Sequence, residues 1–333
     1  MQGADEQAGS QGKALHLTAN LFAVPFGLVG LAQAWSAVTK LAGASALPGN
    51  VLWIIAAVAW LIILAAYLSN VAAQRRWKAE LSDPTFGPFT ALIVIVPMLL
   101  GARLAEQAKD AGQVVFWVSA ALMVVTGAWI TGDWITCDGG IRRWNPGYYL
   151  PTAAGGLLAG GASAVLGFPT VSRVLFGLGI TSFVVLAPII SLRLYDVPSL
   201  PPPLLPTIAI ELAPPVVAGN AWFEINGDKV DTPAAVLAGL SLLMLLVQLR
   251  LVPLYRRAPF GPGYWAFSFP YAAAVTYGVA WLDVEHANGA ADVGYALVAI
   301  LTTGFALLAA RTVIGLVHGT FLPRTPTAGR PPG

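Results

Sequence analysis

Charged side chains are scarce in this chain of 333 residues: Asp, Glu, Lys and Arg make up 10% of it, where an ordinary soluble domain has about 25%. The formal net charge is only +2, so the composition gives no indication of a nucleic-acid partner. The single cysteine, Cys137, excludes an internal disulfide and a multi-cysteine metal cluster. His16, His286 and His318 lie far apart without metal-ligand spacing, so we expect no metal site.

Catalytic and nucleotide-binding motifs are missing as well. The sequence has no phosphate-binding loop of the form G-x-x-x-x-G-K-[ST], no G-x-S-x-G motif and no paired-aspartate motif. We therefore expect no cofactor and no enzymatic activity, and neither ATP-driven transport nor intramembrane hydrolysis by this chain.

Hydrophobic residues make up 57% of the chain, and they gather in ten long apolar runs. Each run has about 20 residues or more, which is enough for a helix to cross the roughly 30 Å hydrocarbon layer of a membrane. We predict an all-α polytopic membrane protein, with ten transmembrane helices within residues 15–318 and disordered tails at residues 1–14 and 319–333. The predicted spans are 17–39, 51–73, 86–105, 113–132, 148–167, 171–192, 204–224, 232–254, 264–283 and 293–317.

Basic residues are distributed unevenly between the two sides that these spans define. If the N-terminus is cytoplasmic, most of the 18 lysines and arginines fall on the cytoplasmic side. Because an excess of Lys and Arg is typical of cytoplasmic loops, we expect a multi-pass protein of the plasma membrane with both termini in the cytoplasm.

The odd-numbered runs begin at similar intervals, which suggests five helical hairpins of similar length. Deep prolines occur mainly in these odd-numbered runs, and a proline removes one backbone hydrogen bond from a helix. One interpretation is an inner ring of kinked helices around a pore, enclosed by straighter even-numbered helices. The other is that proline is simply more frequent in membrane helices. The candidate kinks are at Pro25, Pro97, Pro151, Pro214, Pro215 and Pro270.

Two phenylalanines open the ninth span. Phe267 and Phe269 are two residues apart, so on a helix they point about 200° from each other and only one can face a central axis. Phe269 directly precedes Pro270, and a phenyl ring in a pore excludes water and moves by a change of rotamer. Aromatic residues in membrane helices more often serve only in packing.

Four short motifs lie in order along the chain: Phe22–Leu31 (FAVPFGLVGL), Tyr148–Thr152 (YYLPT), Ile210–Ala218 (IELAPPVVA) and Trp265–Pro270 (WAFSFP). Together they resemble the TehA / slow-anion-channel / malate-transporter family (the tellurite-resistance/dicarboxylate transporter family), and the resemblance extends over essentially all the spans. It implies five hairpins with quasi-fivefold symmetry around a central pore, a homotrimer with one pore per subunit, and a pore gate at Phe269. Phe267 is the alternative gate if the alignment is displaced.

The same resemblance implies an electropositive conduit without a tight binding site, because helix ends near the axis favour anions. Basic residues at the mouth would add electrostatic steering, although each of them is explained equally well by its effect on topology. The candidates for a cytoplasmic vestibule are Arg75, Arg76, Arg142, Arg143, Arg256 and Arg257.

Glu211 is the main ionisable residue inside a span, and a buried carboxylate in a membrane is by default a functional candidate. It is a proton-coupling site, a partner of a cation such as Arg193 that pairs two helices, or an interfacial residue. A fixed negative charge on the axis would oppose anion flow, so we favour pairing or an interfacial position.

We therefore expect a passive channel or facilitator for small anions such as chloride, nitrate or malate-like carboxylates, embedded in the lipid bilayer. The first alternative is a proton-coupled C4-dicarboxylate or oxyanion transporter of the tellurite type with the same fold. The second is a membrane enzyme or receptor without a conduit.

Overall fold

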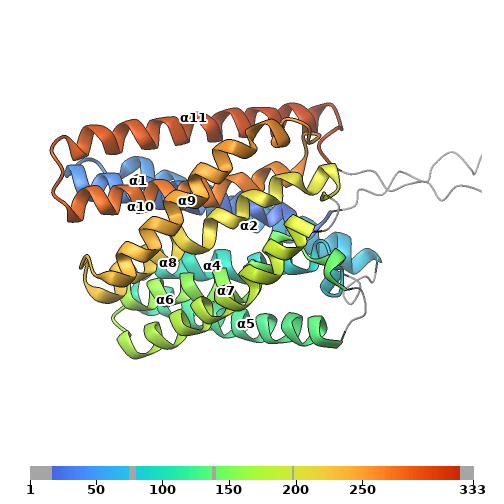
Figure 1. The fold of residues 1–333 in the computed structure, drawn as a ribbon, viewed down its shortest axis with the longest axis horizontal. Helices are drawn as coiled ribbons and strands as arrows, with labels where there is room; N and C mark the ends of the chain where they lie inside the picture. Colours follow the sequence, from blue (N-terminus) through green and yellow to red (C-terminus); the bar gives the residue numbers. More distant parts are fainter. Residues whose placement is uncertain (1–16, 75–79, 137–139, 197–198, 323–333) are drawn as a thin grey trace, which may run out of the picture.

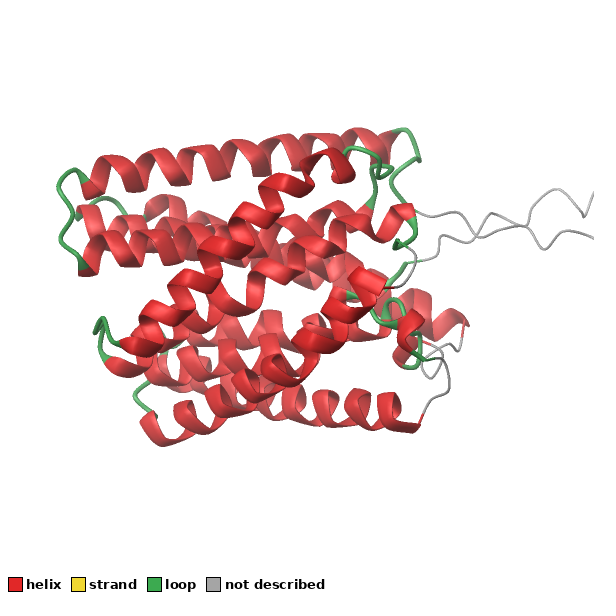
Figure 2. Cartoon of the chain, viewed as in Figure 1, coloured by secondary structure: helices red, strands yellow, loops and turns green. Residues whose placement is uncertain are grey.

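The computed structural model of the protein describes residues 17–74, 80–136, 140–196 and 199–322. Arg75, Arg76 and Cys137 lie outside the described residues, as do the expected N-terminal tail and the expected C-terminal tail beyond Leu322. Every regular element in the described part is helical, and no strand occurs there (Figure 2). Its α-helices lie side by side along the long direction of the bundle, with α11 at one edge and α5 at the other (Figure 1).

Ten α-helices are present among the described residues. They are α1 (Ala23–Ala42), α2 (Leu47–Gln74), α4 (Leu92–Leu104), α5 (Lys109–Thr136), α6 (Gly155–Val165), α7 (Pro169–Asp196), α8 (Ala213–Asn226), α9 (Thr232–Tyr255), α10 (Ser268–Val284) and α11 (Ala290–Val317). Short helices precede five of them or lie in a connection: η1 (Ala19–Phe22), η2 (Gly87–Ala91), η3 (Ile141–Arg143), η4 (Pro146–Tyr149), η5 (Leu150–Ala154), η6 (Pro202–Leu212) and η7 (Pro262–Phe267).

Within the described residues, eight continuous helical stretches are long and apolar enough to cross a membrane. They correspond to eight of the ten predicted spans. The fifth and ninth predicted spans are also helical, but each is divided. The fifth consists of η4, the π-helical η5 and α6, and the ninth consists of η7 and α10.

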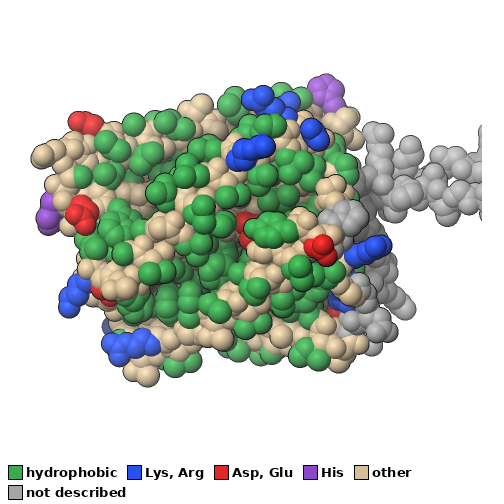
Figure 3. All heavy atoms as spheres, in the orientation of Figure 1, with side chains coloured by type: hydrophobic (Ala, Val, Ile, Leu, Met, Phe, Trp, Pro, Cys, Tyr) green, Lys and Arg blue, Asp and Glu red, His purple; other side chains and the backbone are tan. Residues whose placement is uncertain are grey.

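Burial alternates along the chain. The most apolar part of Ala19–Ala42 is 67% buried and that of Pro202–Asn226 is 78% buried, whereas the corresponding parts of Leu47–Ala73 and Thr232–Tyr255 are each 17% buried. On the face in Figure 3, apolar side chains cover most of the surface between the two ends of the bundle. Such a surface is typical of contact with lipid.

The buried helices contact one another in a closed sequence: α1 contacts α4, α4 contacts α6, α6 contacts α8, α8 contacts α10, and α10 contacts α1 again. Each of them also packs against the long, more exposed helix that follows it in the chain. The core of the molecule therefore lies among α1, α4, α6, α8 and α10.

The prolines lie mostly where a short helix gives way to an α-helix. Pro25, Pro214, Pro215 and Pro270 stand in the first turns of their α-helices, Pro151 lies in η5, and Pro97 lies inside α4. A first turn tolerates proline because its N–H has no intrahelical acceptor. Pro214 cannot donate to the carbonyl of Ile210, and that carbonyl accepts from the N–H of Ala213 instead. The 3-10 geometry of η6 and the prolines of this segment are therefore consistent with each other.

Glycines of α6 serve close helix packing. A Cβ atom added to Gly156 would lie 2.6 Å from the backbone nitrogen of Gly179 in α7, and one added to Gly160 would lie 2.8 Å from that of Phe176. Neither distance can be accommodated without moving backbone, so these positions let α6 and α7 approach each other.

Candidate functional site

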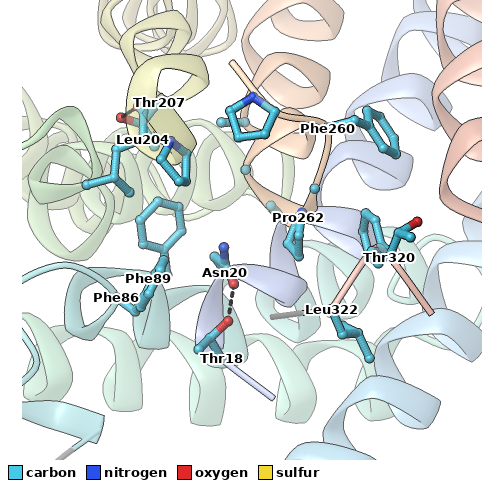
Figure 4. Close-up of a pocket in the computed structure, with 17 residues that line it drawn as sticks. Thr18, Asn20, Phe86, Phe89, Leu204, Thr207, Phe260, Pro262, Thr320 and Leu322 are labelled. Atoms are coloured by element: carbon cyan, nitrogen blue, oxygen red, sulfur yellow. Dashed lines mark hydrogen bonds between the residues drawn. The ribbon is translucent and has the colours of Figure 1, made fainter. Parts of the chain in front are cut away.

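A cavity of about 190 Å³ lies at the end of the bundle where the described chain begins and ends (Figure 4). We call it the terminal cavity. Its walls come from the first turns of η1, η2, η6 and η7 and from the segment Thr320–Leu322. None of the described residues that line it carries a charge.

A larger cavity of about 390 Å³ is lined by the other ends of the same helices, and we call it the far cavity. α1, α4, α8 and α10, with the short helices before them, line the terminal cavity at their N-terminal ends and the far cavity toward their C-terminal ends. These four helices therefore run parallel. The positive ends of their dipoles point to the terminal cavity.

Two phenylalanine rings stand between the cavities. Ala23 and Ala266 line the terminal cavity, and Phe26 and Phe269 lie one turn further along the same helices. Their rings stack with centroids 3.7 Å apart and an interplanar angle of 12°, and both side chains are buried. Phe269 also lines the far cavity. Along these helices the stack therefore lies next to the residues that line the terminal cavity, and Phe269 borders the far cavity.

Gly30 makes room for this stack. A Cβ atom added there would lie 3.0 Å from Cδ2 of Phe269 and 3.0 Å from the Cβ of Ala272. Both distances are tighter than ordinary van der Waals contact, so a side chain at Gly30 would press on the ring of Phe269.

Phe267 points elsewhere. Its ring meets Tyr255 of α9 edge to face, with centroids 4.8 Å apart, and it lies near Tyr264 and Tyr271. It lines neither cavity. Of the two candidate rings in the ninth span, Phe269 is therefore the one between the cavities.

The far cavity has an acidic lining. Among the described residues that line it, two are basic and four are acidic, which gives a net charge of −2: Lys40, Arg103, Glu106, Glu224, Asp228 and Asp283. Lys40 pairs with Asp228 at 3.7 Å, and Arg103 pairs with Glu106. Glu224 and Asp283 form no salt bridge within the described part of the chain.

Glu211 lies in η6 and lines neither cavity. The hydroxyl of Tyr149 donates a hydrogen bond to its Oε2 at 3.1 Å. Its Oε1 is buried and has no hydrogen-bond partner among the described residues. Tyr149 ends η4, so this hydrogen bond links the irregular starts of the fifth and seventh predicted spans.

The four described arginines of the expected vestibule lie outside the terminal cavity. Arg142 and Arg143 belong to η3, and the Nε of Arg143 donates to the hydroxyl of Tyr148 at 3.3 Å. Arg256 and Arg257 follow α9 and are exposed. None of these four arginines therefore lines the terminal cavity directly.

Phe26 received no role from the sequence, although it lies in the first of the four motifs. One signal was available: Phe26 follows Pro25 directly, and Phe269 precedes Pro270 directly. An aromatic residue beside a proline in two odd-numbered spans could have indicated a pair.

Lipid-facing helices around a buried group of helices, with two internal cavities end to end and an aromatic contact between them, define a multi-pass membrane channel or transporter. Comparison with known families then shows to which family of channels and transporters the chain belongs. The chain belongs to the voltage-dependent anion channel (SLAC1) family, whose model matches residues 16–313. The protein is therefore an anion channel or transporter and not an enzyme, and the resemblance found in the four motifs is confirmed.

Two relatives illustrate the range of the family. The tellurite resistance protein TehA homolog of Haemophilus influenzae is 28% identical over 314 residues, which cover 93% of this chain and 94% of that protein. The S-type anion channel SLAH2 of Arabidopsis thaliana is 26% identical over 279 residues, which cover 80% of this chain and 51% of the plant protein.

Proposed function

We propose that the protein is a passive channel for small anions such as chloride, nitrate or malate-like carboxylates, and that the ring of Phe269 closes it. The observation that carries this proposal is the stack of Phe26 and Phe269 between two cavities. Two apposed phenyl rings offer no hydrogen bond to an ion or to its water, so they form an apolar barrier. A change of rotamer at Phe269 would open the path without moving a helix.

The proposal includes an orientation and an assembly. The terminal cavity faces the cytoplasm, because most of the basic residues fall on that side, and the protein resides in the plasma membrane. The closed sequence of contacts among α1, α4, α6, α8 and α10 supports a quasi-fivefold arrangement of five hairpins around the conduit. A homotrimer follows from the family resemblance alone.

The decisive variant is Phe269→Ala. Removing the ring joins the two cavities, so the anion conductance of the variant in planar bilayers should exceed that of the wild type by about tenfold or more, equivalent to removing ~1.4 kcal/mol or more of barrier. The current should be anion-selective, as measured by its reversal potential in a salt gradient.

Phe267→Ala is the matched control, since it removes the same kind of ring two residues away in the sequence. Phe267 packs on Tyr255 and lines neither cavity, so its loss should leave the conductance near the wild-type level. A folded Phe269→Ala protein with unchanged conductance would refute the gate.

One observation favours the alternative of a proton-coupled transporter for C4-dicarboxylates or tellurite-type oxyanions. Glu211 is an ionisable residue inside a span with one buried oxygen that lacks a partner. Its position beside neither cavity argues against direct contact with the transported anion.

A further inference from the structure

We propose that the terminal cavity contains a binding subsite for a small monovalent anion, with the side-chain amide of Asn20 as the donor. This proposal deepens the proposed function and rests on it. It places an anion-binding position in the terminal cavity, on one side of the stack of Phe26 and Phe269. The sequence did not single out Asn20.

Asn20 is buried, with 7% of its surface exposed, and it lines the terminal cavity. The hydroxyl of Thr18 donates to its Oδ1 at 2.6 Å, which fixes the amide so that its nitrogen is on the opposite side. Figure 4 shows this nitrogen pointing away from Thr18 and into the cavity. Among the described residues it has no acceptor. The nitrogen is not among the fully buried atoms without a partner but is open to the cavity, so its N–H groups are available to an acceptor that enters the cavity.

The N-terminal ends of the helices around Asn20 add a positive electrostatic potential to the cavity. Thr18 precedes the helix Ala19–Ala42 without capping it, because its hydroxyl bonds to Asn20 instead. The starts of Gly87–Leu104 and Pro202–Asn226 also line the cavity. Pro202–Asn226 has no side-chain cap, whereas the carboxylate of Asp83 accepts from the N–H groups of Thr85 and Phe86 just before Gly87–Leu104. The dipoles of these long helices have their positive ends at the cavity, where they favour an anion.

The chemistry of the walls limits the class of anion. The cavity measures about 190 Å³, and no charged side chain is found among the described residues that line it. Its walls are largely apolar and include four phenylalanines, Phe86, Phe89, Phe260 and Phe321. Neutral donors and apolar walls cannot offset the dehydration of a dianion. A weakly hydrated monovalent anion such as nitrate therefore suits the subsite, whereas a malate-like dianion would pass through the cavity without being held there.

Asn20→Asp is the sharpest variant. Aspartate keeps an acceptor for the hydroxyl of Thr18, so the local fold is preserved, but it replaces the N–H donors by a negatively charged oxygen. In the Phe269→Ala background, nitrate current is measured in excised patches while nitrate is varied on each side in turn. The half-saturating nitrate concentration should rise about tenfold, as expected for losing a hydrogen bond to a charged partner, and only on the side of the terminal cavity.

Thr320→Val is the matched control. Thr320 lines the same cavity, but its hydroxyl already donates to the carbonyl of Gly315. Its loss should change the half-saturating concentration by less than about twofold, since it removes no free donor.

A second measurement does not depend on current. Sodium nitrate should raise the melting temperature of the otherwise wild-type protein in detergent, relative to sodium gluconate at equal ionic strength, because binding to the folded state stabilises it. Asn20→Asp should abolish this rise, and disodium malate should not produce it. If nitrate stabilises both proteins equally, or neither, the subsite is refuted. If Phe269→Ala carries no anion current, the proposed channel function fails, and the nitrate-dependent melting shift still decides about the subsite.

Discussion

The carboxyl group of Glu211 decides between a passive channel and a proton-coupled transporter. Its Oε2 accepts from Tyr149, and the residue lines neither cavity. An anion that moves from one cavity to the other past Phe26 and Phe269 therefore does not meet this carboxyl group directly. Its contact with Tyr149 joins η4 to η6, which favours a role in holding two inner helices together.

Glu211→Gln should therefore leave anion flux unchanged within about twofold, and it should not alter the dependence of flux on a pH gradient. Glutamine retains an oxygen that can accept from Tyr149, so folding is preserved. Glu211→Leu removes that acceptor and leaves the hydroxyl of Tyr149 unpaired, which should cost about 1–3 kcal/mol of stability. Liposome uptake with and without a pH gradient checks the first expectation, and unfolding in detergent checks the second. Loss of gradient-driven uptake in Glu211→Gln would favour the coupled transporter.

The sequence predicts a ring at Phe269 or Phe267, whereas the stacking partner Phe26 is indicated only by its own position beside a proline. Helical geometry shows that only one of the two rings can face a central axis, and the contact of Phe267 with Tyr255 in the structure separates the two. Phe26 lies in a different span, and no pattern within either span states that α1 and α10 are adjacent. Their closeness depends on Gly27 and Gly30, where added Cβ atoms would meet Ser268 and Phe269.

At the scale of the elements, hydropathy located the long outer helices well. The predicted span 232–254 is the helix Thr232–Tyr255, and 293–317 is Ala290–Val317. The hydropathy pattern could not show that the inner helices begin as 3-10 or π turns. That depends on which carbonyls lose their donors to proline and which alternative donors lie nearby, as Ala213 does for Ile210.

The link between α8 and α9 depends on Asp231. This residue caps α9, and its Oδ1 accepts from the N–H of Ala234 at 3.0 Å and from Nε1 of Trp222 at 2.8 Å. Asn226 donates to its Oδ2 at 3.2 Å. The pKa of this carboxyl lies below its ordinary value, chiefly because of the hydrogen bond from Ala234 and further because of those from Trp222 and Asn226.

Asp231→Ala should therefore lower the melting temperature by a few degrees at neutral pH. Because the folded-state pKa is depressed, the stabilisation by Asp231 is fully present above the ordinary pKa of about 4 and is lost as the pH falls below it. The difference between wild type and variant should shrink accordingly in melting curves recorded in detergent from pH 7 to pH 3. Asp231→Asn retains a capping oxygen and should show a smaller deficit at neutral pH. A deficit in Asp231→Ala that is constant over this range would contradict the assignment.

For the whole molecule, the two cavities differ in charge. The terminal cavity has no charged lining residue among those described and receives the positive ends of parallel helices, whereas the lining of the far cavity sums to −2. The overall composition, with a net charge of +2, could not reveal this, because the difference arises only when α1, α4, α8 and α10 bring their C-terminal ends together. Anions should therefore enter more easily from the terminal cavity than from the far cavity.

We predict that the anion current rectifies and that this rectification depends on Glu224 and Asp283. They are the two acidic lining residues without a salt bridge in the described structure. In the Phe269→Ala background, the double variant Glu224→Gln and Asp283→Asn should raise anion entry from the far side by about two- to fivefold at low salt, and the gain should fade as salt screens the charges. Glu285→Gln is the matched control, because Glu285 is acidic and close in sequence but does not line the cavity. Current–voltage curves in symmetrical chloride measure the ratio of the anion currents in the two directions. Rectification that survives the double variant at low ionic strength would place its origin in the helix dipoles or the aromatic stack, and not in the acidic lining.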